Sequence, residues 1–171
     1  EKISEDNILQ IHNNKTAIYS FEGPLHLGAV LGECTEVQLK NLTAYAIPLG
    51  IGFQIKDDNL GIFGKQGVLG KPIFSDLKEG KKTLLVLKAY EWSTNNQKKK
   101  ILKALGNQNL TREEGTEIAD IITDTGSKEY SINKKNNYRD ECLEALTNAN
   151  IDSESKEILI DYSDKMVNRD K

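Results

Sequence analysis

The chain has 171 residues, 37% of them hydrophobic and 29% charged, with 23 lysines and arginines against 26 aspartates and glutamates. Apolar residues recur along the whole sequence, which argues against intrinsic disorder. Only 3 prolines and no short repeat are present, which excludes the collagen-like, mucin-like and low-complexity classes,. The net charge of −3 argues against a dedicated nucleic-acid-binding protein, so we expect no nucleic acid among its partners.

The cysteine spacing and the hydropathy of the sequence indicate where in the cell the protein is expected. Cys34 and Cys142 lie too far apart for a CxxC or zinc-binding spacing, so we expect two reduced thiols in a cytoplasmic protein. No apolar run has the length that a membrane span needs. The chain begins with Glu1 rather than Met, which leaves a preceding targeting segment open.

The first half of the chain predicts two long helices. Ser4 is a suitable N-cap for a helix that extends to about residue 21,. Helical spacing places four of its side chains on one face: Ile8, Ile11, Thr16 and Tyr19,. The second helix covers residues 36 to about 60, where Pro48 predicts a kink,. Gly50 and Gly52 in this helix allow another helix to approach closely.

The second half predicts a loop followed by shorter helices. Residues 61–82 contain five glycines and Pro72, which is typical of a long functional loop. Further helices are predicted at 83–91, 97–105, 111–124 and 131–146, and after Asp152. The T-R-E-E sequence at 111–114 is a capping box,. An apolar stripe in the last helix predicts core packing for Ile158, Leu159, Tyr162 and Met166,. We therefore expect an all-α protein.

Charge is concentrated between residues 56 and 88, which contain seven lysines and four acids. This local positive zone in a negative chain suggests a small anionic partner rather than a polyanion, with a solvated loop as the alternative. Asp57 and Asp58 follow an apolar helical run, and adjacent carboxylates repel each other unless a cation neutralises them. Magnesium binds one or two carboxylates and completes its shell with water and substrate phosphates. The pair predicts a metal–diphosphate site, with a solvated helix terminus as the alternative.

Four ordered blocks of sequence carry a family resemblance. They are K-T-A-I-Y-S-F (15–21), G-F-Q-I-K-D-D-N-L-G (52–61), G-K-P (70–72) and S-D-L-K-E-G-K-K-T-L-L (75–85). Together they resemble the trans-prenyl diphosphate synthases of the polyprenyl synthetase family, and most of all the geranylgeranyl diphosphate synthases. The resemblance implies an all-α helical bundle of the isoprenoid synthase type. The resemblance also implies that residues 1–171 are the C-terminal portion of a polyprenyl synthetase domain, and we expect the N-terminal half with the first aspartate-rich motif to be absent from this sequence.

The resemblance implies metal ligands in the second aspartate-rich motif, D-D-x-x-D. Asp57 and Asp58 match its first two positions and are expected to bind Mg²⁺. Its third position is Gly61, as in some geranylgeranyl-type members, and this departure is expected to weaken one metal contact.

The resemblance also implies substrate-binding and catalytic residues. Lys15, Lys71 and Lys81 match lysines that bind the allylic diphosphate. Thr16 and Gln54 match residues whose oxygens face the reacting carbon, and with Lys15 they form the expected catalytic set. Phe53 matches an aromatic residue near the homoallylic substrate.

The implied function is a Mg²⁺-dependent condensation of isopentenyl diphosphate with dimethylallyl, geranyl or farnesyl diphosphate. A homodimer or an assembly with the N-terminal half is expected, and the chain alone is expected to be inactive. Two alternatives are a non-catalytic regulatory subunit of a heteromeric prenyl synthase and a helical interaction domain that binds a divalent ion loosely. The presence of Asp57, Asp58, Lys71 and Lys81 favours the enzyme.

Overall fold

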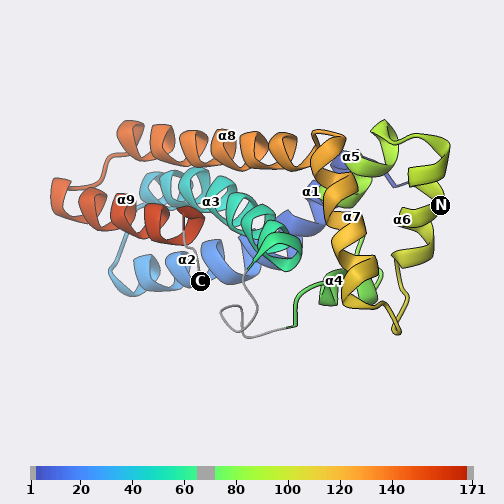
Figure 1. Cartoon of the computed structure of the whole chain (residues 1–171). Coiled ribbons are helices and arrows are strands. Elements are labelled where there is room, and N and C mark those ends of the chain that lie inside the picture. The colour runs from blue at the N-terminus through green and yellow to red at the C-terminus, as the bar shows by residue number, and fades with distance from the viewer. Residues whose placement is uncertain (1–2, 65–71, 169–171) are drawn as a thin grey trace. The chain divides into compact units, whose positions relative to one another are not determined.

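The computed structural model describes residues 3–64 and 72–168, and every regular element within these ranges is a helix (Figure 1). In chain order the helices are α1 (Glu5–His12), the π-helix η1 (Asn13–Glu22), α2 (Gly23–Leu31), α3 (Glu36–Phe63), α4 (Ser75–Lys78), α5 (Leu84–Trp92), α6 (Asn95–Ala104), α7 (Arg112–Asp124), α8 (Ser127–Asn148) and α9 (Ser153–Asn168). The predicted all-α class is confirmed. None of the helices in the described ranges is long and apolar enough to cross a membrane.

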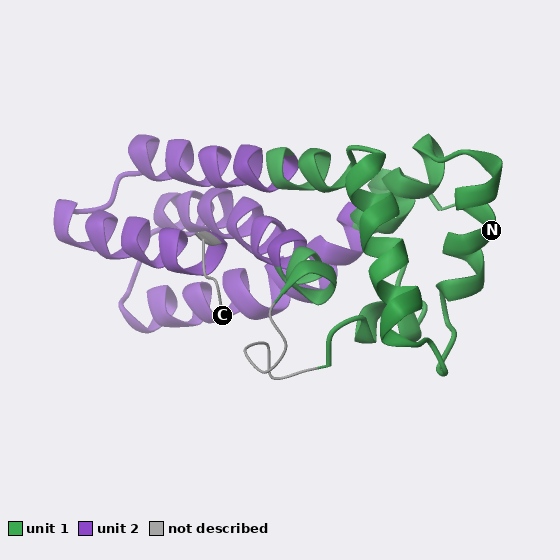
Figure 2. Cartoon of the chain, in the orientation of Figure 1, with its two compact units in different colours: residues 1–8, 57–133, 170–171 green, residues 9–56, 134–169 purple. Residues whose placement is uncertain are grey.

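Contacts divide the chain into two compact units, which Figure 2 shows in different colours. Unit 1 comprises the described residues within 1–8 and 57–133, and unit 2 those within 9–56 and 134–169. Each unit has its own hydrophobic core. The helices α3 and α8 contribute residues to both units.

Several helix starts follow the capping signals in the sequence. The Ser4 hydroxyl accepts a hydrogen bond from the backbone N–H three residues later, at 3.2 Å. Thr111 and Glu114 form the predicted reciprocal capping box. Asp152 accepts from the backbone N–H of Ser155 at 2.9 Å. These side chains satisfy N–H groups that have no partner inside their helices, which is why the helices begin there.

The π-helix changes the face that the first predicted helix presents. After His12 the chain follows the wider turn of η1, in which hydrogen bonds join residues five apart. Ile8 and Thr16 are buried, whereas Ile11 is exposed and Tyr19 is 79% exposed, so the prediction of one shared face was wrong. For Tyr19 the reason is that the prediction assumed the α-helical period beyond His12. Ile11 lies in α1, before η1, where the buried side chains are those of Ile8 and His12.

Unit 2 is held together by an apolar core with one polar network inside it. The core residues are Phe21, Tyr45, Ala46, Leu49, Cys142, Leu146 and Val167. The Tyr45 hydroxyl donates to the carbonyl of Leu159 at 2.9 Å and accepts from the Ser163 hydroxyl at 3.0 Å. Leu159 and Met166 pack against this core as predicted. Ile158 and Tyr162 are exposed, so the stripe is narrower than the sequence suggested.

Unit 1 is built around a second core, to which α5, α6 and α7 contribute. These three helices contact one another, and Ile101, Ile118 and Ile122 are almost completely buried. The helix α3 continues to Phe63, beyond the predicted end at residue 60. Gly61 therefore lies in a helix and not in a loop, and this changes what it faces.

Candidate active site

Thr16 and Gln54 meet in unit 2, although 38 positions separate them in the sequence. Thr16 lies on η1, is 6% exposed, and donates from Oγ1 to Oε1 of Gln54 on α3 at 2.7 Å. A Cβ atom at Gly50 would lie 2.7 Å from Cβ and 3.1 Å from N of Ala17, and closer still to its Cα. Gly50 therefore allows η1 to lie directly against α3, which confirms the predicted close approach.

The other two predicted residues of unit 2 differ in their surroundings. Lys15 is exposed on η1, next to the buried Thr16. Phe53 is partly buried against the core of unit 2, and its ring meets the ring of Phe21 edge to face with centroids 5.2 Å apart. Phe53 thus has a packing role in this structure, and its role toward a substrate stays a prediction.

Asp57 and Asp58 lie on the C-terminal turns of α3, in unit 1. Asp57 is partly buried, and Asp58 is 5% exposed. The neighbouring Asn59 is also buried, and its Oδ1 accepts a hydrogen bond from the Ser131 hydroxyl on α8 at 2.6 Å. This bond ties the last turns of α3, which carry the two carboxylates, to α8 within unit 1.

The two carboxylates of Asp57 and Asp58 suit magnesium better than a metal ion whose ligands all come from protein side chains. Among residues 3–64 and 72–168, no group of three or more histidines, cysteines or acids is placed to hold a metal ion. Magnesium is bound through one or two carboxylates, with waters and phosphate oxygens completing its octahedral shell. Asp57 and Asp58 can supply those two carboxylates.

Lys81 follows α4 and is held by two acids, whereas Lys71 lies outside the described residues. The Nζ atom of Lys81 is 2.5 Å from Oδ1 of Asp76 and 3.4 Å from Oε2 of Glu79. Burial lowers the pKa of Lys81, but the hydrogen bond and charge of Asp76, together with Glu79, raise it above its usual value,. Lys81 is therefore a cation at neutral pH, as a diphosphate ligand must be.

Asp76 is a residue that sequence reasoning missed. It was counted only as one acid within the lysine-rich segment, yet it is 2% exposed and hydrogen-bonded to Lys81. The signal that could have found it is the D-L-K-E-G-K spacing at 76–81, because the glycine lets the chain turn back so that the lysine reaches the acid. Asp76 also lies against Gly61, the position where the third motif acid is absent.

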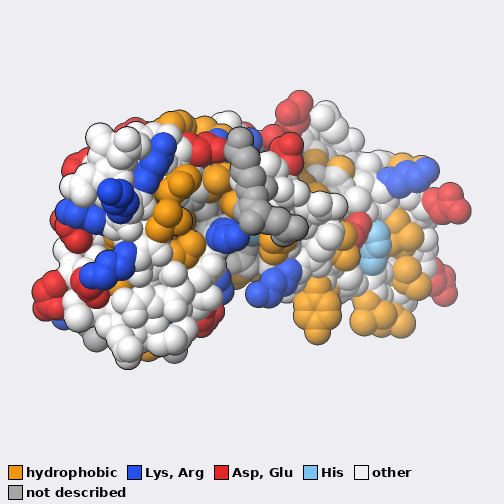
Figure 3. Space-filling model, turned by 90° about the vertical axis from the view of Figure 1, so that its right-hand side faces the viewer, with side chains coloured by type: hydrophobic (Ala, Val, Ile, Leu, Met, Phe, Trp, Pro, Cys, Tyr) orange, Lys and Arg blue, Asp and Glu red, His pale blue; other side chains and the backbone are white. Residues whose placement is uncertain are grey.

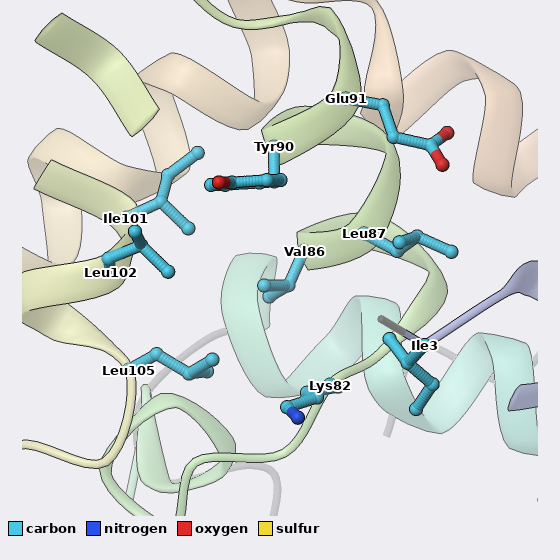
Figure 4. A pocket seen from close by; sticks show the side chains of 9 residues that line it. All are labelled: Ile3, Lys82, Val86, Leu87, Tyr90, Glu91, Ile101, Leu102 and Leu105. Carbon is cyan, nitrogen blue, oxygen red and sulfur yellow. The ribbon is translucent and has the colours of Figure 1, made fainter. Parts of the chain in front are cut away.

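A separate pocket in unit 1 contains none of the predicted site residues. It has a volume of about 350 Å³ and is lined by Ile3, Lys82, Val86, Leu87, Tyr90, Glu91, Ile101, Leu102 and Leu105 (Figure 4). Most of these side chains are apolar and come from α5 and α6. Its lining has one lysine and one glutamate, which does not match the cationic lining that a diphosphate needs.

Comparisons with known proteins agree with the sequence blocks. The model of the polyprenyl synthetase family matches residues 1–122. The geranylgeranyl diphosphate synthase of Saccharolobus solfataricus is 35% identical over 160 residues, which is 94% of this chain and 48% of that protein. The octaprenyl diphosphate synthase of Haemophilus influenzae is 32% identical over 166 residues, covering 97% of this chain and 50% of that protein.

A solved structure shows the same fold. The geranylgeranyl pyrophosphate synthase of Corynebacterium glutamicum, complexed with isoprenyl diphosphate and magnesium, superposes with a TM-score of 0.93 at 27% identity. The match covers 98% of this chain and 48% of that one. The predicted isoprenoid synthase fold is confirmed, and the chain spans about half the length of the relatives it matches.

Proposed function

The chain belongs to the polyprenyl synthetase family, and on that premise we propose that it provides the diphosphate-binding half of a Mg²⁺-dependent prenyl diphosphate synthase. The reaction is the condensation of isopentenyl diphosphate with an allylic diphosphate (dimethylallyl, geranyl or farnesyl). Geranylgeranyl diphosphate is the proposed product, supported by the wording of the sequence blocks and by relatives of that name. The cytoplasm is the proposed location, in keeping with the free thiols of Cys34 and Cys142,.

The observation that carries this proposal is the hydrogen bond between Thr16 and Gln54. The family resemblance assigns their oxygens to the same reacting carbon, and Oγ1 of Thr16 lies 2.7 Å from Oε1 of Gln54. Because Thr16 donates its proton to Gln54, the lone pairs of its hydroxyl oxygen remain able to face a positive charge. A buried hydroxyl takes a hydrogen-bond partner in any protein, so the support comes from the fact that this partner is the other residue that the resemblance assigns to the reacting carbon.

The reaction creates a negative and a positive charge, and different residues are suited to stabilise each of them. Cleavage of the allylic carbon–oxygen bond puts negative charge on the leaving diphosphate and leaves an allylic cation. Lys15 and Lys81 are suited to stabilise the charge of the leaving group, together with Lys71, which the resemblance adds. The oxygen dipoles of Thr16 and Gln54 are suited to stabilise the cation, because neutral oxygens do not capture it as a carboxylate would.

Asp57 and Asp58 are the proposed ligands of Mg²⁺. The bound ion supplies charge neutralisation and orientation of the diphosphate oxygens. The two carboxylates hold it at the C-terminal end of α3, and the burial of Asp58 limits competition from water.

The proposed partners follow from the surface as well as from the family. No residue of α2 is buried, and Leu27, Val30 and Leu31 are all exposed. Figure 3 shows one face of the molecule, on which apolar side chains reach the surface among charged ones. Exposed apolar patches of this kind mark association surfaces. We propose a homodimer, or an assembly with a polypeptide segment that carries the first aspartate-rich motif.

Calorimetry with Mg²⁺ and inorganic pyrophosphate tests the metal assignment. The unmodified chain should bind pyrophosphate only when Mg²⁺ is present, and the Asp57→Asn, Asp58→Asn double variant should lose this binding. Asp140→Asn, Glu141→Gln is the matched control, because it removes two adjacent but exposed acids on α8. If the first double variant binds as well as the control does, the metal assignment is wrong.

A second comparison tests the role of Lys81. Lys81→Ala should weaken pyrophosphate binding by about tenfold or more, since a charge-assisted hydrogen bond contributes roughly 1.5–3 kcal/mol. Lys82→Ala is the control, because this exposed neighbour has the same charge and no role in the proposal. Equal losses in both variants would show that general positive charge, and not Lys81, binds the anion.

A further inference from the structure

The pocket between α5 and α6 has walls that are anchored in the core of unit 1. Val86 on α5 and Ile101 on α6 are 5% and 1% exposed and belong to that core. Both helices begin at a threonine cap, where the hydroxyls of Thr83 and Thr94 accept hydrogen bonds from backbone N–H groups. Because core packing and these caps hold the walls in place, the pocket exists before any ligand binds.

The size and the opening of the pocket suit a small apolar group. Its volume of about 350 Å³ lies at the lower end of the range for small-molecule sites, roughly 300–1,000 Å³. Figure 4 shows apolar side chains facing one another across it: Val86 and Tyr90 on one side, and Ile101, Leu102 and Leu105 on the other. Tyr90 and Leu102 are 37% and 57% exposed, so a ligand can enter from solvent. Burial of its apolar surface against these side chains would drive binding.

Lys82 gives the pocket a positive charge that is available to a ligand. It lines the pocket near the lower edge of the view in Figure 4. Lys82 is exposed, and within the part of the chain that the structure describes it forms no ion pair. The preceding Lys81 is instead held by Asp76 and Glu79. The ammonium group of Lys82 can therefore pair with an anion without giving up an existing partner.

The glutamate that lines the pocket does not cancel this charge. Oε2 of Glu91 lies 3.0 Å from Nζ of Lys88, which also lies 3.0 Å from Oε2 of Glu5. Burial lowers the pKa of Lys88, but the hydrogen bonds and charges of Glu5 and Glu91 raise it above its usual value, so Lys88 is a cation that neutralises Glu91. In Figure 4 the Glu91 side chain points away from Ile101 and Leu102. A ligand in the pocket therefore meets apolar walls and, at one end, the Lys82 cation.

We propose that this pocket binds a small amphipathic monoanion, whose apolar part lies between α5 and α6 and whose acidic group pairs with Lys82. A medium-chain fatty acid is the simplest molecule of this kind. One lysine balances one negative charge, which favours a carboxylate over a diphosphate. The residues that line the pocket are not those of the proposed magnesium and diphosphate site, and a test of the pocket needs no enzyme activity.

Calorimetry with octanoate and 1-octanol, which share one chain length and differ in charge, tests the role of Lys82. Lys82→Met keeps a long apolar side chain but removes its charge. It should weaken octanoate binding roughly threefold to fivefold, the upper part of the range for an exposed ion pair, and leave octanol binding unchanged. Lys99→Met is the matched control, because Lys99 is also exposed but does not line the pocket. Equal octanoate binding by both variants, or an equal loss for octanol, overturns the proposal.

A substitution at the mouth of the pocket tests where octanoate binds. Leu102→Glu removes part of an apolar wall and adds a like charge, so it should weaken octanoate binding by roughly tenfold. Ile158→Glu is the matched control, since this residue of α9 is 63% exposed and lies in unit 2. Circular dichroism checks that both variants are folded. Unchanged octanoate binding in Leu102→Glu contradicts the proposal, and so does a dimer that Leu102→Glu dissociates and Ile158→Glu does not, because a second copy would then fill the pocket.

Magnesium dependence keeps this pocket apart from the proposed active site. Octanoate binding should not need Mg²⁺ and should persist in the Asp57→Asn, Asp58→Asn double variant. Its loss in that variant would place octanoate in the proposed active site and overturn the pocket assignment. If the unmodified chain binds octanoate but not pyrophosphate, the proposed function fails and the pocket stands. If it binds pyrophosphate but not octanoate, the pocket proposal fails and the proposed function stands.

Discussion

The contact between η1 and α3 allows a sharp test in which one methyl group is added to unit 2. Gly50→Ala places a Cβ atom 2.7 Å from Cβ and 3.1 Å from N of Ala17, and closer still to its Cα. These atoms belong to the backbone or are fixed to it, so no rotamer change relieves the overlap and the two helices must move apart. Gly52→Ala is the matched control on the same helix, because its Cβ atom would lie 3.4 Å from Cβ of Tyr138.

Two opposing effects set the size of the change. Alanine stabilises a helix interior by about 1 kcal/mol relative to glycine. Overpacking of a tight contact costs about 1–3 kcal/mol, and the upper end applies here because the backbone itself must shift. We therefore expect Gly50→Ala to lower the free energy of unfolding by about 2 kcal/mol, while Gly52→Ala leaves it unchanged or raises it by up to about 1 kcal/mol.

Urea unfolding followed by circular dichroism at 222 nm measures both variants. Gly50→Ala should also impair catalysis in a complete assembly, because the separation of η1 from α3 lengthens the Thr16–Gln54 hydrogen bond. Equal stability of the two variants would refute the close helix contact, and with it the geometry on which the Thr16–Gln54 pair depends.

Three further predictions concern stability. Burial raises the pKa of the Cys142 thiol from 9.0 to about 11 and also raises the pKa of Tyr45. The unfolded chain therefore loses these protons at a lower pH than the folded chain does, so the free energy of unfolding is at its full value below pH 9 and should fall by about 1 kcal/mol by pH 10 for the thiol alone. Cys142→Ala should reduce this pH dependence in denaturant titrations. Thr111→Ala removes the capping box of α7 and should cost about 1 kcal/mol, with no loss if the helix start is held by packing alone. Tyr130→Phe removes the hydrogen bond that the tyrosine hydroxyl donates to the Glu5 carboxylate, whose two oxygens lie 2.9 and 2.8 Å from it. The loss of about 1 kcal/mol should lower the thermal midpoint of unfolding by a few degrees.

The parts of the fold that the sequence predicted correctly are those with local signals. The caps at Ser4, Thr111 and Asp152 act through backbone groups a few residues away, so their chemistry can be recognised without tertiary information. The π-helix could not be predicted in this way. Its sequence keeps apolar residues at spacings that suit an α-helix, so the pattern does not indicate the wider turn that the structure has at residues 13–22.

Candidate site residues that stand within one sequence motif could be named from the sequence. A contact between residues of two separate segments could not. Asp57, Asp58 and Lys81 could be named from motif blocks, and the structure places them on the end of α3 and beside Asp76. The expectation that Gly61 weakens one metal contact stays a prediction. The approach of the Asp76 carboxylate to Gly61 joins two separate segments of unit 1, so it could not be recognised from a motif that is compared position by position.

Two glycines and the candidate site residues of α3 recur along the helix at a regular spacing. Gly50, Gln54, Asp57 or Asp58, and Gly61 follow one another at intervals of three or four residues, which places them along one side of the helix. At one end of this row a glycine accommodates Ala17 within unit 2, and at the other a glycine accommodates Asp76 within unit 1. In both cases the glycine lies beside a segment that carries a residue of the proposed site, Thr16 in the first and Lys81 in the second. At each of the two positions, the absence of a side chain on α3 is what lets the neighbouring segment of the same unit lie against the helix. It follows that alanine at residues 50 and 61 should affect different functional groups, Thr16 and Lys81 respectively, although both substitutions add the same methyl group to the same helix.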